Sequence, residues 1–563
     1  MLCSAGVASA RWQLDAMETQ LQARPAAQRI VVMVISAPSL LWRLLAPPLL
    51  ALLLGGCASL PPLAEPRPPT LAIAASADTP LGAIAARALE RKRGHGTSRV
   101  LGLANPFAAL DARLGLIRQA RASIDLQVYQ LADDTVGRQV LRELRDAALR
   151  GVRVRLLVDD FYTAGMDGLL LGMAAHDGAQ VRLFNPFAGA RGSSLGRWMQ
   201  MAGDFRRLNH RMHNKLFIVD GAMAIIGGRN LADGYFQRDA DANFIDFDVL
   251  AVGAVLPELA AVFDRYWNSA QVRDIASLAS TDEPAPVLRA RFESATLSTD
   301  PPFMAPAWRG RATPPFDRVL ADGLADLMGA EVTVFADTPA KLDRAPGSMA
   351  GTTYAFAIQS FRESREELML FSPYFIPGES GLAGLREARR HGIAVRVITN
   401  SLGATDEPQA SLAYERYRVP LLQMGVELYE LSATQMRRDE ATRRAFGSSR
   451  AQLHAKLALI DRRAVLLGSM NLDQRSPTTN TEVVLLIRSP ELALEILTSF
   501  NSKERADVRG SYQVKLKPDG RSLQWIALLG EGRTETLDDD PEFNLWERLR
   551  LWLISMFIPE SLL

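Results

Sequence analysis

HNKLFIVD at residues 213–220 and HAKLALID at residues 454–461 are two copies of one pattern, H-x-K-x4-D. The 563-residue chain contains only six histidines, so a chance origin for two such matches is improbable. Each copy also lies on an apolar run that is typical of a β-strand. The pair predicts that the chain holds two related units, each contributing one histidine and one lysine.

Side chains two residues apart share one face of a strand, so the histidine and lysine of each copy point the same way. An imidazole can attack phosphorus, and an adjacent ammonium can neutralise the nonbridging oxygens without a metal ion. The motif aspartates fall on the opposite parity and receive a supporting structural role. The candidate catalytic set is therefore His213, Lys215, Asp220, His454, Lys456 and Asp461, with no metal and no cofactor.

Small and amide residues follow both motifs at the same offset, as GGRN at 227–230 and GSMN at 468–471. Small residues let backbone and amide donors approach a phosphate, so Asn230, Ser469 and Asn471 are candidate phosphate ligands. Acidic residues lie further along, and a carboxylate bonded to the far nitrogen of an imidazole would set its tautomer. The candidates for this orienting role are Asp246, Asp248 and Glu482. Copy two has an N-x-E phrase that copy one lacks, so the choice between the two aspartates stays open.

The rest of the chain repeats a strand–helix–strand pattern twice. Residues 124–129, 135–150 and 152–159 form the first series, and residues 367–371, 380–391 and 394–400 the second. The phrases GVRVRLLVDD and GIAVRVITNS occupy equivalent places. We expect an α/β fold of two tandem repeats, each a mixed β-sheet flanked by helices, forming one pseudo-twofold active site.

Composition outside the repeats predicts further segments. An apolar run at 44–54, too short to span a bilayer, is followed by Gly-Gly-Cys57, which predicts a lipoprotein signal with lipidation of Cys57. A noncleaved anchor with an incidental cysteine is the alternative. The expected organisation is a signal peptide (1–57, with an overextended start), a Pro-rich tether (58–97), repeat one (98–276), a connector (277–351), repeat two (352–510), and a C-terminal hairpin with an amphipathic, membrane-facing segment (511–563).

The motifs and their surroundings resemble the phospholipase D superfamily and, within it, the bacterial cardiolipin synthases of the C type. The supporting phrases are NHRMHNKLFIVDG and IGGRNLADGYF in copy one, and LHAKLALIDR and LGSMNLDQRSPTTNTE in copy two. The resemblance implies that His213 forms a phosphohistidine and that His454 protonates the leaving alcohol, although the reverse assignment stays open. It also implies that Lys215, Lys456, Asn230 and Asn471 hold the phosphoryl oxygens.

The superfamily includes nucleases, so the substrate has to be inferred from other features. Lys and Arg number 64 against 63 Asp and Glu, which gives no large basic field for a nucleic-acid backbone. Residues 545–558 combine aromatic and basic side chains as interfacial segments do, although a helix docked on the core is an equal alternative. The basic and apolar stretch 191–211 is either a lid that receives acyl chains or an ordinary loop.

We expect an enzyme of the bacterial cell envelope, associated with a membrane and anchored at Cys57. Its partners would be phospholipids, namely phosphatidylglycerol and possibly phosphatidylethanolamine, with the membrane surface and an accessory protein of unknown identity. The expected reaction makes cardiolipin through a phosphatidyl-histidine intermediate. Hydrolysis to phosphatidate, an envelope nuclease or phosphodiesterase, and a catalytically inactive lipoprotein scaffold are the alternatives.

Overall fold

The structure is a computed structural model, and it describes most of the chain between Thr70 and Glu542. The described residues are 60, 62, 68–91, 95–189, 191–297, 313–343, 349–438, 449–500, 508, 510–528, 534–542 and 550. Cys57, the expected signal peptide and, apart from Arg550, the expected amphipathic segment 545–558 lie outside them.

The strands of the first repeat form one mixed sheet. Their order across it is β10 (Val272–Asp274), β4 (Ala179–Phe184), β3 (Arg153–Asp159), β2 (Ser123–Val128), β6 (Leu216–Val219), β7 (Met223–Gly227), β9 (Asp248–Gly253) and β1 (Ser98–Leu103). The β2–β3 and β3–β4 pairs are parallel, and the others are antiparallel.

The second repeat has the same order, with each strand in the equivalent place. Its sheet runs β11 (Met328–Ala336), β19 (Val483–Arg488), β17 (Ala464–Gly468), β16 (Leu457–Ile460), β12 (Glu367–Phe371), β13 (Ala394–Asn400), β14 (Glu427–Leu431), β20 (Ser511–Leu516), β21 (Leu523–Leu528) and β22 (Thr534–Leu537). The two sheets meet where β1 pairs antiparallel with β11. A pseudo-twofold axis therefore passes between these two strands, and the expected fold class is confirmed.

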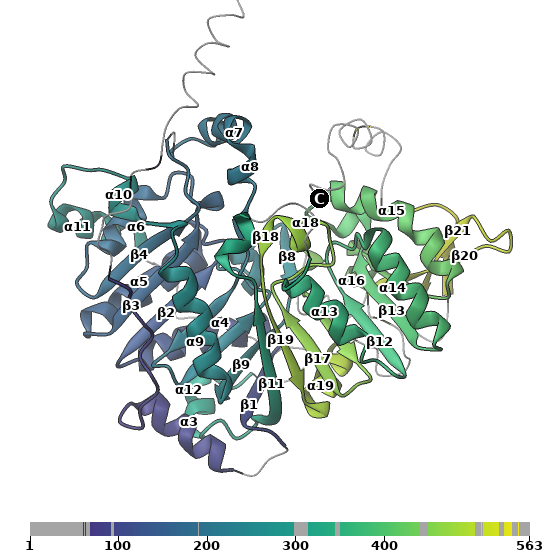
Figure 1. Cartoon of the computed structure of the whole chain (residues 1–563), viewed down its shortest axis with the longest axis horizontal. Helices are drawn as coiled ribbons and strands as arrows, with labels where there is room; N and C mark the ends of the chain where they lie inside the picture. The colour runs from purple at the N-terminus through teal and green to yellow at the C-terminus, as the bar shows by residue number, and fades with distance from the viewer. Residues whose placement is uncertain are drawn as a thin grey trace, which may run out of the picture.

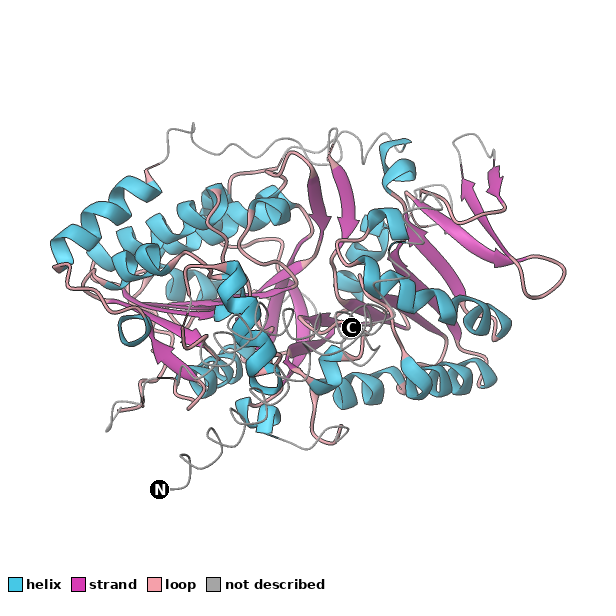
Figure 2. Ribbon diagram, turned by 90° about the horizontal axis from the view of Figure 1, so that it is seen from above, coloured by secondary structure: helices cyan, strands magenta, loops and turns pink. Residues whose placement is uncertain are grey.

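Helices lie on both sides of the strands in each half (Figures 1 and 2). In the first half they are α4 (Pro106–Gln119), α5 (Thr135–Leu149), α6 (Asp167–Ala174), α7 (Ser194–Gly203), α8 (Phe205–Leu208), α9 (Val255–Trp267), α10 (Ile275–Leu278) and α11 (Ala285–Thr296). From α12 onward they are α12 (Phe316–Ala321), α13 (Thr353–Phe361), α14 (Gly378–Arg390), α15 (Pro408–Gln423), α16 (Ala433–Arg438), α18 (Arg475–Thr478) and α19 (Pro490–Phe500). Each repeat has its own apolar core, and a third core contains residues of both repeats.

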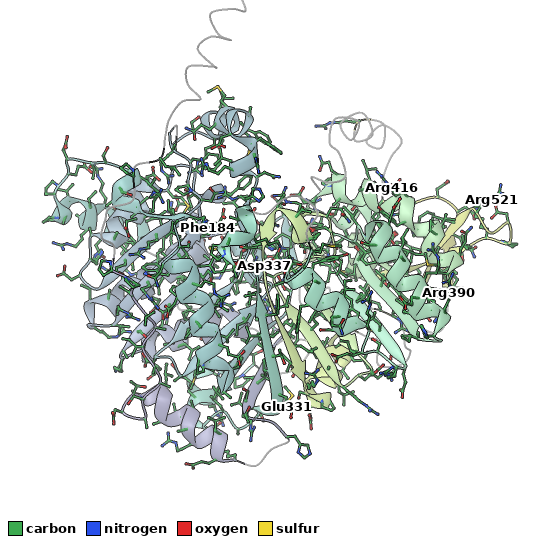
Figure 3. The ribbon with its side chains drawn as sticks, in the orientation of Figure 1. Phe184, Glu331, Asp337, Arg390, Arg416 and Arg521 are labelled. Carbon is green, nitrogen blue, oxygen red and sulfur yellow. The ribbon has the colours of Figure 1, made fainter. Side chains whose placement is uncertain are left out.

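The expected connector, residues 277–351, is more than a link between repeats. It includes β11, which joins the two sheets, and Asp337, which lies near the centre of the molecule (Figure 3). The Asp337 side chain is buried and accepts hydrogen bonds from the backbone N–H groups of Thr353 (2.9 Å) and Glu482 (3.0 Å). The prolines of this stretch obscured a strand that both repeats need.

The expected tether, residues 58–97, is corrected in its later part. Residues 80–90 form helix α3 (Pro80–Glu90), which begins with an N-cap at Thr79 and buries Leu81, Ala85 and Ala88. Before it, the Thr70 hydroxyl accepts a 2.8 Å hydrogen bond from the Trp267 indole. The composition of the prolines near residue 60 does not extend to this segment, because its apolar side chains recur with helical spacing and pack on the first repeat.

Within the part of the chain that the structure describes, no helix combines the length and apolar character needed to cross a bilayer.

Candidate active site

A cavity of about 840 Å³ lies where the two repeats meet, and both motif histidines line it. This size is within the range of pockets that bind small molecules. The lining includes Asn230 from the first repeat and Asn471 from the second. The residues that the sequence groups into two distant motifs therefore share one site.

Each histidine is hydrogen-bonded to a carboxylate of the other repeat. His213 Nδ1 lies 2.9 Å from Glu482 Oε2, and His454 Nδ1 lies 2.6 Å from Asp246 Oδ2. All four side chains are buried. A carboxylate on Nδ1 fixes the proton there and leaves Nε2 as the basic, nucleophilic nitrogen. The crossing of the pairs means that neither repeat orients its own histidine.

Two short parallel strand pairs produce this crossing. β5 (Arg211–Met212) pairs with β18 (Asn480–Thr481), and β8 (Ala242–Ile245) pairs with β15 (Arg450–Leu453). In both pairs the motif histidine follows one strand directly and its carboxylate partner follows the other. Backbone bonds continue the register, because the N–H groups of His213 and His454 donate to carbonyls of the opposite repeat at 2.9 and 2.8 Å.

The two orienting carboxylates have different surroundings. Burial alone would raise the pKa of Asp246, but the charge of and hydrogen bond from His454, with Lys456 and Arg229 nearby, lower that pKa to about 2. Burial raises the pKa of Glu482 to about 7, against the opposing charge of Lys215. At neutral pH Asp246 is therefore the more firmly ionised of the two.

Neighbouring residues at equivalent positions match this difference. The Ser469 hydroxyl donates to Glu482, and Ser476 Oγ lies 3.3 Å from the same carboxylate. Gly228 is the counterpart of Ser469 in the first repeat, and a Cβ there would lie 2.1 Å from an oxygen of Asp246. The longer glutamate is thus held by hydroxyls, whereas the shorter aspartate packs directly against a glycine.

Both imidazoles are held in their neutral form in the empty site. Burial and the charges of Lys215 and Lys456 lower the pKa of His213 well below its usual value. Burial and Lys456 lower the pKa of His454 to about 4. His454 Nε2 lies 3.4 Å from the Tyr235 hydroxyl, so this nitrogen faces a polar group at the cavity wall.

The motif lysines lie beneath the histidines. Lys215 Nζ donates to the His213 carbonyl at 2.8 Å, and Lys456 Nζ donates to the His454 carbonyl at 2.6 Å. Each ammonium has three donors, so each retains capacity for an anion. Burial and the neighbouring Lys456 lower the pKa of Lys215 to about 7, and burial lowers the pKa of Lys456 to about 8.

The motif aspartates hold the sheet and do not line the cavity. Asp220 accepts hydrogen bonds from the backbone N–H groups of residues 121–123, at the start of β2. Asp461 accepts them from residues 365–367, at the start of β12. Both have left-handed backbone conformations, with φ of 51° and 50°. Their place in the candidate catalytic set is corrected to the supporting role that strand parity predicts.

Two further candidates have contacts that differ from their expected roles. Asp248 is bonded to Arg113 Nη2 and Arg229 Nη1, each at 3.0 Å, and the orienting aspartate of the first repeat is Asp246. Ser469 was a candidate phosphate ligand, but its hydroxyl contacts Glu482. The glycine at the equivalent position gave no signal that a hydroxyl was needed for a carboxylate.

The two asparagines differ in their contacts. Asn230 donates to the Tyr235 hydroxyl at 2.8 Å and accepts from the Gln130 backbone at 3.2 Å. Asn471 Oδ1 is buried at the cavity and has no hydrogen-bond partner within the described part of the chain. Asn471 therefore has free capacity for a ligand, whereas Asn230 is already part of a chain that leads to His454.

Sequence reasoning missed two residues that position the motifs. Asp159 accepts a 2.8 Å hydrogen bond from the backbone N–H of Met212, and Asn400 accepts one of the same length from Leu453. Each donor directly precedes a motif histidine. The signal was present, because Asp159 and Asn400 occupy matching places in GVRVRLLVDD and GIAVRVITNS. Tyr235 was also missed, although it lies within the quoted phrase IGGRNLADGYF.

Comparisons with known proteins agree with this site. The family model described as "Cardiolipin synthase, PLD-like domain" matches residues 114–267 and 357–503, one segment in each repeat. Cardiolipin synthase C of Escherichia coli strain K12 is 35% identical over 460 residues, which cover 81% of this chain and 94% of that protein. Cardiolipin synthase A of Pseudomonas fluorescens strain Pf-5 is 26% identical over 397 residues, covering 70% and 66%.

Among solved structures, the phosphatidylserine synthase of Haemophilus influenzae shares the fold, with a TM-score of 0.52 at 13% identity over 85% of this chain and 99% of that one. The paired motif segments and the extent of the 35% identity decide the assignment. The chain belongs to the cardiolipin synthase family of phospholipase D-like enzymes and is a phosphatidyltransferase of that superfamily.

Proposed function

We propose that the enzyme makes cardiolipin by transferring a phosphatidyl group from one phospholipid to the glycerol headgroup of phosphatidylglycerol. The observation that carries the proposal is the pair of crossed histidine–carboxylate contacts beside two buried lysines. This arrangement supplies a nucleophile, a proton carrier and positive charge within one cavity. The name and extent of the Escherichia coli relative support a phospholipid as substrate.

The first step breaks the bond between phosphorus and the donor headgroup. Nε2 of His213 attacks phosphorus, and a phosphatidyl-histidine forms as the headgroup oxygen leaves. That oxygen takes a proton from Nε2 of His454. The negative charge of the bound phosphodiester raises the pKa of the nearby imidazole, so His454 carries this proton in the substrate complex.

The second step reverses these roles. A hydroxyl of the acceptor headgroup loses its proton to Nε2 of His454 as its oxygen attacks phosphorus. The bond between phosphorus and His213 breaks, and the free imidazole is restored. When water takes the acceptor's place, the product is phosphatidate, so transfer and hydrolysis share every protein group.

The difference between the two carboxylates favours His213 as nucleophile. An ionised Asp246 stabilises positive charge on His454, as a residue that alternately holds and releases a proton requires. The raised pKa of Glu482 gives His213 less negative charge to stabilise an imidazolium, so its imidazole stays neutral and nucleophilic.

The lysines and Asn471 would hold the phosphoryl oxygens. Lys215 and Lys456 lie on either side of the pseudo-twofold axis and each keeps N–H donors beyond its carbonyl contact. Because they are buried, their charges act in a medium of low polarity and are worth more than at the surface. No nucleic acid is expected as partner, since the chain as a whole carries a formal net charge of only +1.

A membrane location follows from the proposed substrates. Lipidation of Cys57 would tether the enzyme to a membrane of the bacterial envelope, where phosphatidylglycerol and phosphatidylethanolamine are available. Labelling with a radioactive fatty acid tests the anchor. Incorporation that a Cys57→Ser variant loses would support it, and equal incorporation would contradict it.

The function is tested in a bacterial host that lacks its own cardiolipin synthases. Wild-type chain should restore cardiolipin, and His213→Ala and His454→Ala should not. In vitro, phosphatidylglycerol should be supplied with and without phosphatidylethanolamine and the products separated by thin-layer chromatography. Phosphatidate as the sole product would assign the enzyme to hydrolysis instead.

The roles of the two histidines are separated with a p-nitrophenyl phosphodiester, whose leaving group departs without a proton. We expect His454→Ala to lose at least about 100-fold on a phospholipid but much less on this substrate. His213→Ala should lose at least about 10⁴-fold on both, because no covalent intermediate can form. The opposite pattern would exchange the two roles.

A further inference from the structure

Helix α7, at the top of the first half in Figure 1, packs against the protein in an unusual direction. Its buried residues are Gly196 and Arg197, whereas Leu195, Trp198 and Met199 are 70%, 72% and 43% exposed. Helices of water-soluble proteins normally bury their apolar side chains and expose their charged ones. In α7 an arginine points inward and the large apolar side chains point outward.

The exposed apolar residues form one patch. Trp198 and Met199 follow Leu195 by three and four positions, so the three side chains lie on one face of the helix. Phe205, at the start of α8, is also 43% exposed. Leu195, Trp198, Met199 and Phe205 are called the α7 patch below. Exposed apolar side chains gathered in this way mark a surface that a partner covers.

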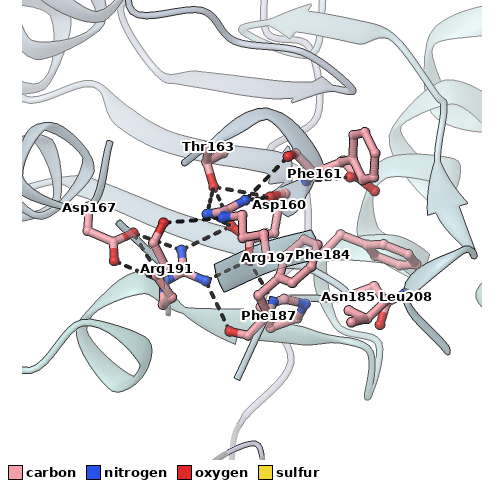
Figure 4. Close-up of polar contacts among 12 residues, drawn as sticks. Asp160, Phe161, Thr163, Asp167, Phe184, Asn185, Phe187, Arg191, Arg197 and Leu208 are labelled. Carbon is pink, nitrogen blue, oxygen red and sulfur yellow. Dashed lines mark hydrogen bonds and ion pairs between the residues drawn. The ribbon is translucent and has the colours of Figure 1, made fainter. Parts of the chain in front are cut away.

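A buried ionic network fixes α7 in place (Figure 4). The Asp160 carboxylate accepts from Arg191 Nη1 at 2.5 Å and Nη2 at 2.9 Å. Arg197 Nε donates to the Arg191 carbonyl at 3.2 Å, Arg197 Nη2 donates to Thr163 Oγ1 at 3.1 Å, and the guanidinium lies 4.8 Å from the Phe187 ring centroid. Removing one member of such a buried network would leave an unpaired charge. The helix is therefore held from its polar side, and its apolar face does not contribute to its attachment.

The α7 patch is continuous with the catalytic cavity. Trp198 and Phe205 both line that cavity while remaining exposed, and Met201 and Leu208 extend the same wall inward. The exposed Arg206 lies beside the patch. An apolar path bordered by a basic residue thus leads from the histidines to the outer surface. A ligand with a phosphate at one end and hydrocarbon at the other fits this path.

We propose that the α7 patch inserts into the surface of a phospholipid bilayer and positions the cavity over the substrate's headgroup. The inference rests on the proposed lipid function and adds where and how the enzyme meets the membrane. Trp198 would lie at the level of the headgroups, where an amphipathic ring is most stable, with Leu195 and Met199 directed toward the acyl chains. Arg206 would contact lipid phosphates. The acyl chains of the substrate would leave the cavity along Trp198 and Phe205 without first leaving the bilayer.

The first test separates docking from chemistry by using two forms of substrate. The full-length Leu195→Ser/Trp198→Ser variant should lose about tenfold or more of its turnover on long-chain phosphatidylglycerol vesicles. Its turnover on a short-chain phosphatidylglycerol, dissolved as monomers, should stay within about twofold of wild type. The matched control is Leu149→Ser on α5, which alters a leucine of similar exposure, 65%, away from the cavity. Equal losses on both substrates, or no loss on either, would overturn the proposal.

The second test needs no turnover. In a full-length His213→Ala background, vesicles of phosphatidylglycerol with brominated acyl chains should quench tryptophan fluorescence, and Trp198→Phe should remove part of that quenching. Trp525→Phe, at a buried position, should leave it unchanged. Quenching that does not depend on Trp198 would overturn the proposal. So would self-association that the Leu195→Ser/Trp198→Ser variant abolishes, because a second copy would then cover the patch. If wild type converts no phospholipid but Trp198 is still quenched, the proposed function fails and the docking surface stands.

Discussion

The surroundings of the two histidines are alike in backbone and different in side chains. On both sides of the axis a short parallel strand pair brings a histidine to a carboxylate, and Asp159 or Asn400 holds the preceding N–H. The partners, however, are Glu482 with a serine on one side and Asp246 with a glycine on the other. The backbone keeps the twofold symmetry that builds the site, and the side chains break it. We infer that this break assigns one histidine to phosphorus and the other to the proton.

The sharpest way to break the comparison is to neutralise each carboxylate. Asp246→Asn should lower kcat by about 10²- to 10³-fold, because an amide cannot stabilise the imidazolium that His454 forms. Glu482→Gln should cost about tenfold, because His213 acts as a neutral nucleophile. Kinetics on a short-chain phospholipid measure both losses, and thermal unfolding checks that each variant folds. Equal losses would mean that the two histidines do not have separate roles.

A smaller effect is expected from exchanging the residues beside the carboxylates. Gly228→Ser places a side chain where a Cβ already lies 2.1 Å from Asp246, so it should displace that carboxylate and lower activity by about 10- to 100-fold. Ser469→Gly removes only a hydrogen bond to Glu482 and should cost less than about tenfold. Activity and the melting temperature of both variants check this order. Wild-type activity in Gly228→Ser would show that Asp246 does not need its present position.

The smallest expected effect is a pH dependence that comes from the lysines. Lys215 and Lys456 have pKa values of about 7 and about 8 in the empty site. A lysine is charged below its pKa, so their attraction for phosphate is present at lower pH and is lost as pH rises. We expect kcat/KM to fall by about tenfold per unit above about pH 8, and kcat to fall later because bound phosphate keeps the lysines charged. Lys515→Arg, on the distant β20, is the control. A kcat/KM that stays level to about pH 10 would contradict the lowered pKa values.

Much of the fold was predictable because its signals are local. The expected strand at 152–159 and helix at 135–150 agree with β3 and α5 to within one residue at each end. The β20–β21 hairpin lies around the Lys-Pro-Asp-Gly turn, as expected. Helix α3 and strand β11 were not predicted, because neighbouring prolines dominated the composition of the segments that contain them.

The site was predictable in its members but not in its pairing. Strand parity placed the histidines and lysines together and separated Asp220 and Asp461 from them. The contact between His213 and Glu482 spans 269 residues and depends on the register of β5 with β18. Nothing in the local sequence reports that register. For the same reason Asp248, which is as close in sequence as Asp246, could not be set aside in advance.

The crossed pairs make the two halves of the chain interdependent in a further sense. Each half contains a reactive imidazole, yet the group that orients it belongs to the other half. A half that had folded alone, or a chain whose halves had not yet docked, would carry histidines without a defined tautomer. The enzyme therefore behaves like a lock with two keys, because reactivity toward lipid arises only when assembly is complete.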